Sequence, residues 1–430
     1  MNKLNYERVH FIGIGGVGMS GMATILNELG IFVTGSDLIE NQMIVSLKKS
    51  GIKVSIGHQQ GSNLPVSCDL VVFSSAVQVD NLELVEANNR GIKTIRRGLF
   101  LAELGQSFPF TIAVSGSHGK TTTTAMLVHI FKTIGFDPAY MVGGAVATWS
   151  SNASFGAGQV FITEIDESDG TQSYFHPDVS IILNVEDDHA WSAGGKDQLF
   201  ESFRQVAQNS NQCFVWSNTQ TQELLGELDS VTLIMDVDSQ IKVPQIGNHN
   251  LIDASMALQV ALAYGLDRSA IIEALASFPG VKRRMTQHGE DSARQILLLE
   301  DYAHHPTELD CFYDALQEIA NGRSLVIVFQ PHRYERIKRY HREFSTVLAK
   351  FDQVILLPPF AAWKADQGLA DPRLLMSELN AGQAIYWEGE LSDLPQAAVD
   401  FFPSEKVIVS IVGAGDISNI VEPVIKAFGL

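Results

Sequence analysis

Residues 111–124, TIAVSGSHGKTTTT, combine residue types that bind phosphate. Apolar residues predict a buried strand as far as Val114, and glycines then turn the chain into a helical pattern. Backbone N–H groups in such a turn, together with the positive end of the helix, stabilise an anion. Lys120 can reach the terminal phosphates of a nucleotide, and the Thr121 hydroxyl can ligate Mg²⁺. Val114 stands where the usual pattern has glycine, so the spacing predicts a short variant of an ATP-binding loop; the alternative is a Gly/Ser turn with an exposed lysine.

A second glycine-rich stretch lies near the start of the chain. Residues 9–37 predict a strand, a glycine turn, a helix and a second strand that ends at Asp37. NAD is the usual ligand of this pattern. A nucleotide-sugar diphosphate also carries phosphates that a glycine turn and a helix N-terminus can bind. Residues 54–57 and 70–74 predict further strands, and Ser75 follows the second of these at a ligand-binding edge, where it could equally form a turn or cap. The glycines of the turn are Gly13, Gly15, Gly16 and Gly18.

Polar clusters follow two more predicted strands. Residues 159–164 are followed by IDESDG, and residues 179–184 by VEDDHAW. The carboxyl ends of parallel strands meet at one edge of a sheet, so both clusters are expected near the phosphate loop. Glu164 and His189 are the predicted metal ligands, although Mg²⁺ prefers oxygen and the histidine could instead support a ligand or cap a helix. The remaining acids are expected to be solvated or to cap helices: Asp166, Asp169, Asp187 and Asp188.

The last third of the chain predicts another parallel α/β unit. DYAHHPTE follows one strand, and Thr307 there is expected to cap a helix that begins near Glu308. FQPHRYER follows the next strand and supplies Arg333 and Arg336, which would share one face if their segment begins a helix. The alternative is a solvated basic helix face, to which Lys338, Arg339 and Arg342 are expected to belong. The adjacent pair at 304–305 lacks the spacing of zinc ligands. The predicted strands are residues 295–300, 323–329, 353–357 and 406–412.

Length and composition limit the class of protein. A chain of 430 residues predicts two or three domains, and we place them at 1–104, 105–280 and 281–430. The strand–helix alternation is expected to pause at residues 96–109. A net charge of −19 argues against general nucleic-acid binding. No apolar run is long enough for membrane insertion, the first residues lack an apolar signal core, and three scattered cysteines fit a reducing cytoplasm.

Three α/β units around a nucleotide site suit the ATP-driven joining of two substrates, with a carboxylate activated as an acyl phosphate. The motifs that point this way resemble the Mur ligases over nearly the whole chain. In order, they are GIGGVGMSG, SGSHGKTTTT, EIDESDG, NVEDDH, GNHN, GVKRRM, DYAHHPTE and FQPHRYER. The resemblance implies a Rossmann-like UDP-binding domain, a P-loop-type ATPase domain and a Rossmann-like C-terminal domain. It also implies that ATP and Mg²⁺ are used to join L-alanine to UDP-N-acetylmuramate, by a monomer or weak homodimer in the cytoplasm.

The resemblance also implies roles for single residues. It assigns UDP-sugar binding to Gly15, Gly16, Gly18, Asp37, His58 and Ser75. It assigns ATP binding to Gly116, Ser117, His118, Gly119, Lys120, Thr121, Thr122, His249, Asn250 and Arg283. It assigns the magnesium ions to Thr121, Glu164 and His189. It assigns the amino-acid site to Tyr302, His304, Arg333 and Arg336, and catalytic roles to Lys120, His304, Arg333 and Arg336.

Several positions depart from the family pattern. Ser117 stands for a usual threonine and Asp253 for a usual asparagine, while residues 190–192 and the stretch LPPFAAWKADQG are unusual. The alternative within the family is a ligase (Mpl-like) that adds another amino acid or a recycled peptide, although FQPHRYER favours addition of L-alanine. An NAD(P)-dependent dehydrogenase would leave Lys120, Glu164 and His189 without a role. A non-catalytic nucleotide sensor is the third reading, and complete phosphate and metal groups argue against it.

Overall fold

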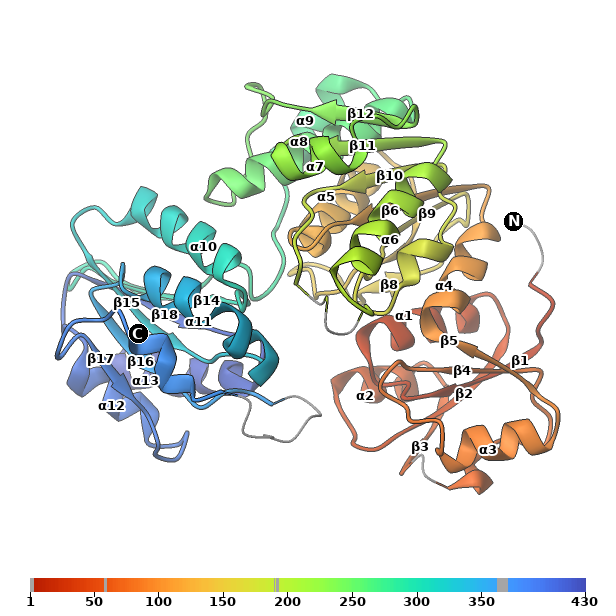
Figure 1. The fold of residues 1–430 in the computed structure, drawn as a ribbon, viewed down its shortest axis with the longest axis horizontal. Helices are drawn as coiled ribbons and strands as arrows, with labels where there is room; N and C mark the ends of the chain where they lie inside the picture. Colours follow the sequence, from red (N-terminus) through yellow and green to blue (C-terminus); the bar gives the residue numbers. More distant parts are fainter. Residues whose placement is uncertain (1–3, 58–59, 189, 191–192, 362–369) are drawn as a thin grey trace. The chain divides into compact units, whose positions relative to one another are not determined.

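The computed structural model describes residues 4–57, 60–188, 190, 193–361 and 370–430. Over these residues the strands form three sheets, each packed against helices (Figure 1). Contacts divide the chain into two compact units. The first holds Met1–Pro244 with Leu251–Gly280, and the second holds Gln245–Asn250 with Val281–Leu430. The predicted fold class, three α/β domains, is confirmed. No helix in the described part of the chain combines the length and apolar character needed to cross a membrane.

The first sheet has the strand order β3-β2-β1-β4-β5, and every pair in it is parallel. The direction of the strand order reverses at β1, and open α/β sheets bind ligands beyond the carboxyl end of the strand at which this reversal occurs. The glycine turn begins at Gly13, directly after this strand. The strands are β1 (Arg8–Ile12), β2 (Phe32–Asp37), β3 (Lys53–Ile56), β4 (Leu70–Phe73) and β5 (Lys93–Arg96). The helices are α1 (Val17–Glu28), α2 (Gln42–Lys49), α3 (Leu82–Asn89) and α4 (Arg97–Gln106).

The second sheet has the order β12-β11-β10-β6-β9-β7-β8 and is parallel except for β8. β6 lies between β9 and β10, so the three polar loops that follow these strands meet at one edge, as predicted. The strands are β6 (Phe110–Ser115), β7 (Ala139–Met141), β8 (Ala153–Ser154), β9 (Val160–Glu164), β10 (Val179–Ile182), β11 (Gln212–Trp216) and β12 (Val231–Ile234). The helices are α5 (Lys120–Thr133), η2 (Thr171–Tyr174), α6 (Lys196–Asn209), α7 (Thr219–Leu225), α8 (Asn248–Ala263) and α9 (Arg268–Ala276).

Helix α4 corrects the predicted pause in the alternation at residues 96–109. It follows β5 without a break and packs on η2 and the residue after it. A Cβ on Gly98 would overlap the Thr171 side chain, and one on Gly105 would lie 3.0 Å from the Phe175 ring. The two glycines weaken the helical signal in the sequence, but they allow the helix to approach this closely.

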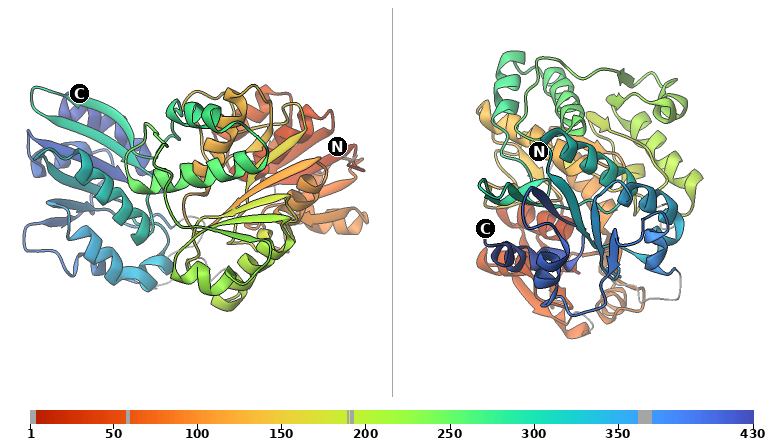
Figure 2. Two further views of the ribbon diagram at one scale, coloured as in Figure 1. Left: turned by 90° about the horizontal axis from the view of Figure 1, so that it is seen from above. Right: turned by 90° about the vertical axis from the view of Figure 1, so that its left-hand side faces the viewer.

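The sheet of the second unit has the order β13-β14-β18-β15-β16-β17. Its two faces, which can be followed in Figure 2, are covered by α10 with α11 and by α12 with α13. The four predicted strands pair in parallel, as expected, but β13, which was not predicted, pairs antiparallel with β14. β13 has a mostly polar sequence, TQHGED, which hides it among turn residues. The elements are β13 (Thr286–Asp291), β14 (Ile296–Asp301), α10 (Pro306–Ile319), β15 (Ser324–Phe329), α11 (Tyr334–Leu348), β16 (Gln353–Leu356), β17 (Ala384–Tyr386), α12 (Leu394–Phe401), β18 (Val407–Val412) and α13 (Val421–Phe428).

The start of α10 also differs from the prediction. His305, rather than Thr307, is the N-cap: its side chain accepts a hydrogen bond from the Thr307 N–H, and Glu308 reaches back to the His305 N–H. Pro306 occupies the first helical position, which suits its fixed φ and missing N–H. The helix therefore begins two residues before Glu308.

Candidate active site

The loop between β6 and α5 has the backbone of a phosphate cradle. Gly116 has φ +140° and Gly119 has φ +84°, conformations that favour glycine. A Cβ on Gly119 would lie 2.7 Å from a carboxylate oxygen of Asp253. Hydrogen bonds fix this loop to the segment that follows β10. In one of them, the His118 N–H donates to the Asn184 side chain at 2.8 Å. The same segment donates the Glu186 N–H to the Ser117 hydroxyl at 2.8 Å.

Lys120 begins α5 and folds back over this loop. Its ammonium donates to the Gly116 carbonyl at 2.6 Å and lies 2.8 Å from a carboxylate oxygen of Glu167. Burial raises the pKa of the Glu167 carboxyl to about 7, while Lys120 draws it down. Burial also opposes the charge of Lys120, but the carboxylates around it, Glu167 foremost, outweigh that effect and raise its pKa. The ammonium is therefore held in its charged form at the position predicted for phosphate binding.

Thr121 and Glu164, two predicted metal ligands, lie together. The Thr121 hydroxyl donates to a carboxylate oxygen of Glu164 at 2.7 Å. Both side chains offer an oxygen atom as a metal ligand. Mg²⁺ prefers oxygen ligands, so the two residues fit that ion. His189 and His58 lie outside the described residues. Thr122, also predicted for ATP, is buried in the first turn of α5.

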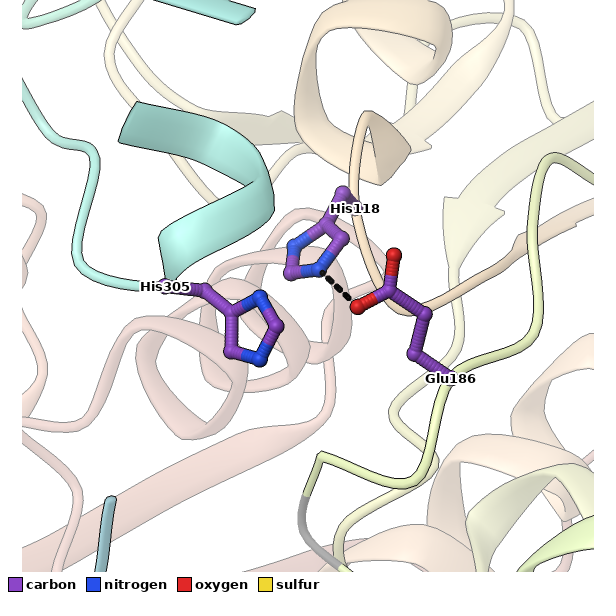
Figure 3. Close-up of side chains that lie close together, drawn as sticks. All are labelled: His118, Glu186 and His305. Carbon is purple, nitrogen blue, oxygen red and sulfur yellow. Dashed lines mark hydrogen bonds and ion pairs between the residues drawn. The ribbon is translucent and has the colours of Figure 1, made fainter. Parts of the chain in front are cut away.

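Figure 3 shows the side chains of His118 and Glu186, which are joined by a dashed line. The His118 Nε2 lies 3.3 Å from a Glu186 carboxylate oxygen. Residue 118 belongs to the phosphate loop and residue 186 to the segment after β10. This contact between two side chains joins the same two loops as the hydrogen bonds of the His118 N–H and the Glu186 N–H, so all three contacts fix the cradle.

The acidic loop between β9 and η2, residues 165–170, is less solvated than predicted. Arg97, the first residue of α4, donates from Nη2 to Asp166 at 3.0 Å and from Nε to Asp169 at 3.0 Å. Nothing in the sequence indicates this cation, which lies about 70 residues away and reaches both carboxylates. The expectation of solvated or capping acids is wrong for Asp169, whose side chain is 12% exposed, whereas the Asp166 side chain is 39% exposed. It is also wrong for Asp188, which is buried. Asp187 is half-buried.

Sequence reasoning missed Arg97 and Glu167. Arg97 stands beside another arginine in a stretch without a recognised pattern, and nothing in the sequence identifies its partners. Glu167 had a weak signal, because it lies three residues after Glu164 in the run EIDESDG. Its contact with Lys120 spans 47 positions and exists only because β9 lies next to β6.

Hydrogen bonds from side chains and backbone also fix the glycine turn after β1. The Gly15 N–H donates to the Asp37 carboxylate at 2.8 Å, and the Asn41 side chain donates to the Gly15 carbonyl at 3.0 Å. Gly16 is the N-cap of α1 and brings no side chain to it, which leaves the helix N-terminus open to an anion. Ser75 lies exposed in the turn after β4. The structure thus brings the predicted UDP-binding glycines together with Asp37 at the switch point of the sheet.

The second unit gathers another set of predicted residues. The Tyr302 ring lies 4.8 Å from the Arg283 guanidinium carbon, and the His304 Nδ1–H donates to the Tyr302 carbonyl at 2.9 Å. His304 also lies 3.3 Å from Glu308, and its ring centre is 5.5 Å from that of His332. Tyr302 and His304 follow β14 and His332 follows β15, and the carboxyl ends of these strands share one edge of the sheet.

The two predicted arginines lie differently from each other. Arg333 has φ +69° and is the N-cap of α11, so it lies before the helix, whereas Arg336 lies within it. The idea that they share one helix face is therefore wrong. Arg336 is only 1% exposed and donates to the His332 carbonyl at 3.2 Å. The exposed basic face predicted farther along α11 is confirmed for Lys338, Arg339 and Arg342.

His249 and Asn250 lie in the first turn of α8, on a rigid element, as predicted. Burial, with a smaller effect of Arg284, lowers the pKa of His249 to about 4. The Asn250 side chain donates to the Ile246 carbonyl at 2.7 Å. A neutral imidazole can donate or accept a hydrogen bond from a base, which suits the predicted contact with adenine.

Comparisons with known proteins cover all three sheets. Residues 8–109 match the catalytic domain of the Mur ligase family, residues 114–232 the Mur ligase middle domain, and residues 283–415 the Mur ligase glutamate ligase domain. A UDP-N-acetylmuramate–L-alanine ligase from Sinorhizobium fredii is 33% identical, over 95% of both chains. One from Methylobacillus flagellatus is 35% identical, over 97% of this chain and 96% of its own.

Solved structures give the same result. The UDP-N-acetylmuramate–alanine ligase MurC from Thermotoga maritima superposes with a TM-score of 0.80 at 26% identity, over 98% of this chain and 99% of its own. A murein peptide ligase, Mpl, from Psychrobacter arcticus has the same fold, with a TM-score of 0.70 at 20% identity over 98% of both chains. The chain therefore belongs to the Mur ligase family, the ATP-dependent ligases of peptidoglycan synthesis.

Proposed function

We propose that this chain joins the amine of L-alanine to the carboxylate of UDP-N-acetylmuramate, with cleavage of ATP to ADP and phosphate. The observation that carries the proposal is the identity of 33–35%, over nearly the whole chain, to proteins named for this reaction. Lys120 on a phosphate cradle, with Thr121 and Glu164 beside it, supplies the groups that the ATP half of the reaction needs.

The reaction has two steps. The sugar carboxylate attacks the terminal phosphorus of ATP, which breaks the bond to ADP and forms an acyl phosphate. The alanine amine then attacks the acyl carbon, loses a proton and displaces phosphate. Lys120 stabilises the negative charge on the transferred phosphoryl group, and positioning supplies much of the rest. Magnesium held by Thr121 and Glu164, with His189 as the third proposed ligand, would neutralise phosphate charge when bound.

The three substrates would use different parts of the chain. Gly15, Gly16, Gly18 and Asp37, together with Ser75 and His58, would hold the UDP group at the switch point of the first sheet. Gly116, Ser117, His118, Gly119 and Thr122, with His249, Asn250 and Arg283, would hold ATP. Tyr302, His304, Arg333 and Arg336 would hold the amino acid. The chain has three cysteines that lie far apart in the sequence, a pattern typical of a reducing cytoplasm, which supports a cytoplasmic reaction.

Phosphate release tests this function. We expect release only when ATP, Mg²⁺, UDP-N-acetylmuramate and an amino acid are all present, with L-alanine giving the highest kcat/KM in a panel of amino acids. A preference for a tripeptide would assign the chain to the recycling ligases. Turnover of NAD(P)H without phosphate release would instead support the dehydrogenase reading, and nucleotide binding without either reaction would support a sensor.

A further inference from the structure

Arg97 lies between the first turn of α1 and the acidic loop that follows β9. On one side, its Nη1 atom lies 3.0 Å from the position that a Cβ on Gly18 would occupy, in the first turn of α1. On the other side, its Nε and Nη2 atoms bind two carboxylates of the acidic loop, those of Asp166 and Asp169. The side chain is 20% exposed, so most of it is packed between these neighbours.

The acidic loop contacts Arg97 and also Lys120 of the ATP cradle. Asp166 and Glu167 are adjacent, and their side chains bind different cations: Arg97 holds the first, and Lys120 the second. Glu164, at the end of β9, accepts the hydrogen bond from Thr121. A short run of acids is therefore fixed at one end by a guanidinium from α4 and at the other by the residues that we assign to ATP.

Helix α4 gives this guanidinium a fixed origin. Gly98 packs directly on Thr171, at the far end of the acidic loop, with no space for a side chain between them. Thr171 donates its N–H to Asp169 at 3.1 Å, so the residue that the helix contacts also orients a carboxylate bound to Arg97. The Arg97 side chain is therefore fixed at its backbone by the packing of α4 and at its planar guanidinium by the two carboxylates, which leaves the guanidinium little freedom to move.

We propose that Arg97 is a positioning residue. It fixes the position of the acidic loop, and through that loop the position of Lys120, relative to the first turn of α1. The inference rests on the proposed function, in which the sugar carboxylate must come within about 3–3.5 Å of the reacting phosphorus. Its role is to set the separation between the UDP-binding glycines and the ATP cradle. A misplacement of about 1 Å costs on the order of 10²-fold in rate.

The test compares Arg97→Lys, which keeps the charge but loses the fork, with Arg96→Lys at the exposed neighbouring position. We expect Arg97→Lys to lower kcat by about 10–100-fold, while KM for ATP and for UDP-N-acetylmuramate changes by less than about 3-fold. Arg96→Lys should match the wild type. A large rise in the UDP-sugar KM would make Arg97 a direct ligand and overturn the proposal, as would an unchanged kcat.

Two further measurements separate positioning from general stability. Asp169→Asn removes the charge of one of the two carboxylates that Arg97 binds. The double variant with Arg97→Lys should be no slower than the slower single variant, and additive losses would contradict a shared role. Hydrogen–deuterium exchange in residues 164–174 and 116–121 should rise in Arg97→Lys but not in Arg96→Lys. This readout needs no turnover, so it tests the inference even if the wild type fails to join L-alanine, a result that would count against the proposed function alone.

Discussion

The ammonium nitrogen of Lys120 lies 2.8 Å from a carboxylate oxygen of Glu167, and the Glu167 side chain is almost completely buried. A buried ion pair is costly to break, because the remaining charge is left in a medium of low polarity. In this chain the pair also holds the lysine on the cradle that we assign to ATP. The Glu167 carboxylate therefore supplies the negative charge beside Lys120 in the ligand-free protein. We expect phosphate oxygens to supply negative charge there when the nucleotide binds.

Glu167→Gln should destabilise the ligand-free protein by on the order of 3 kcal/mol, because it leaves the Lys120 charge without its main partner. MgATP should then raise the melting temperature of this variant more than that of the wild type, because the triphosphate restores negative charge beside the ammonium. Differential scanning fluorimetry with and without MgATP measures both effects. The matched control is Glu273→Gln, at an exposed position on α9 in the same unit. Equal nucleotide shifts in variant and wild type would refute the compensation.

Lys120→Ala should lower kcat by about 10²–10³-fold, because it removes a preorganised charge from the transferred phosphoryl group. Binding of UDP-N-acetylmuramate, measured by calorimetry, should stay near the wild-type value. Lys242→Ala, at an exposed position, serves as the control. Near wild-type turnover at saturating ATP would remove Lys120 from the reaction.

Glu164→Gln should raise the Mg²⁺ concentration needed for half-maximal phosphate release, because an amide oxygen carries no charge to bind the ion. The hydrogen bond from Thr121 can persist on the amide oxygen, so affinity for the UDP-sugar should not change. A magnesium titration of the initial rate checks this, with Glu201→Gln on the exposed face of α6 as control. An unaltered magnesium dependence would exclude Glu164 as a ligand.

Arg336→Lys should raise the KM for the amino acid by about 10–100-fold, because a fork to a carboxylate is worth about 1.5–3 kcal/mol. The KM values for ATP and UDP-sugar should move little. Steady-state kinetics with each substrate varied in turn decide the matter, and Arg342→Lys on the exposed part of α11 is the matched control. If only the melting temperature falls and the amino-acid KM stays constant, Arg336 has a structural role.

His249 should titrate near pH 4 in the folded protein, because burial lowers its pKa to about 4. The unfolded chain, with a pKa of about 6.5, binds more protons between these two values, so the contribution of His249 to stability is present above about pH 6.5. That contribution is lost as the pH falls toward 4. NMR titration of labelled histidines, with His249→Gln to assign the signal, measures the pKa directly. A pKa near 6.5 would contradict the expectation, because it is the value of a solvated imidazole.

The glycine turns and the strands before them were predictable from the sequence, because they depend on interactions between near neighbours. Gly116 and Gly119 adopt positive φ values within four residues of Lys120, and the Gly15 turn follows its own strand directly. The family resemblance rests on the same local motifs. It grouped Thr121 with Glu164, and the structure joins these two side chains by a hydrogen bond.

Only the tertiary structure identified the partners of these residues. Arg97 meets Asp166 and Asp169 across about 70 positions, and Lys120 meets Glu167 across 47. Local spacing carries no information about such pairs, because they depend on which strands lie side by side and on how closely α4 approaches η2. The same reason applies to β13, whose polar sequence forms a strand because β14 offers it an edge with unpaired backbone groups. Backbone conformation is largely a local property, whereas charge pairing and burial depend on the packing of distant segments.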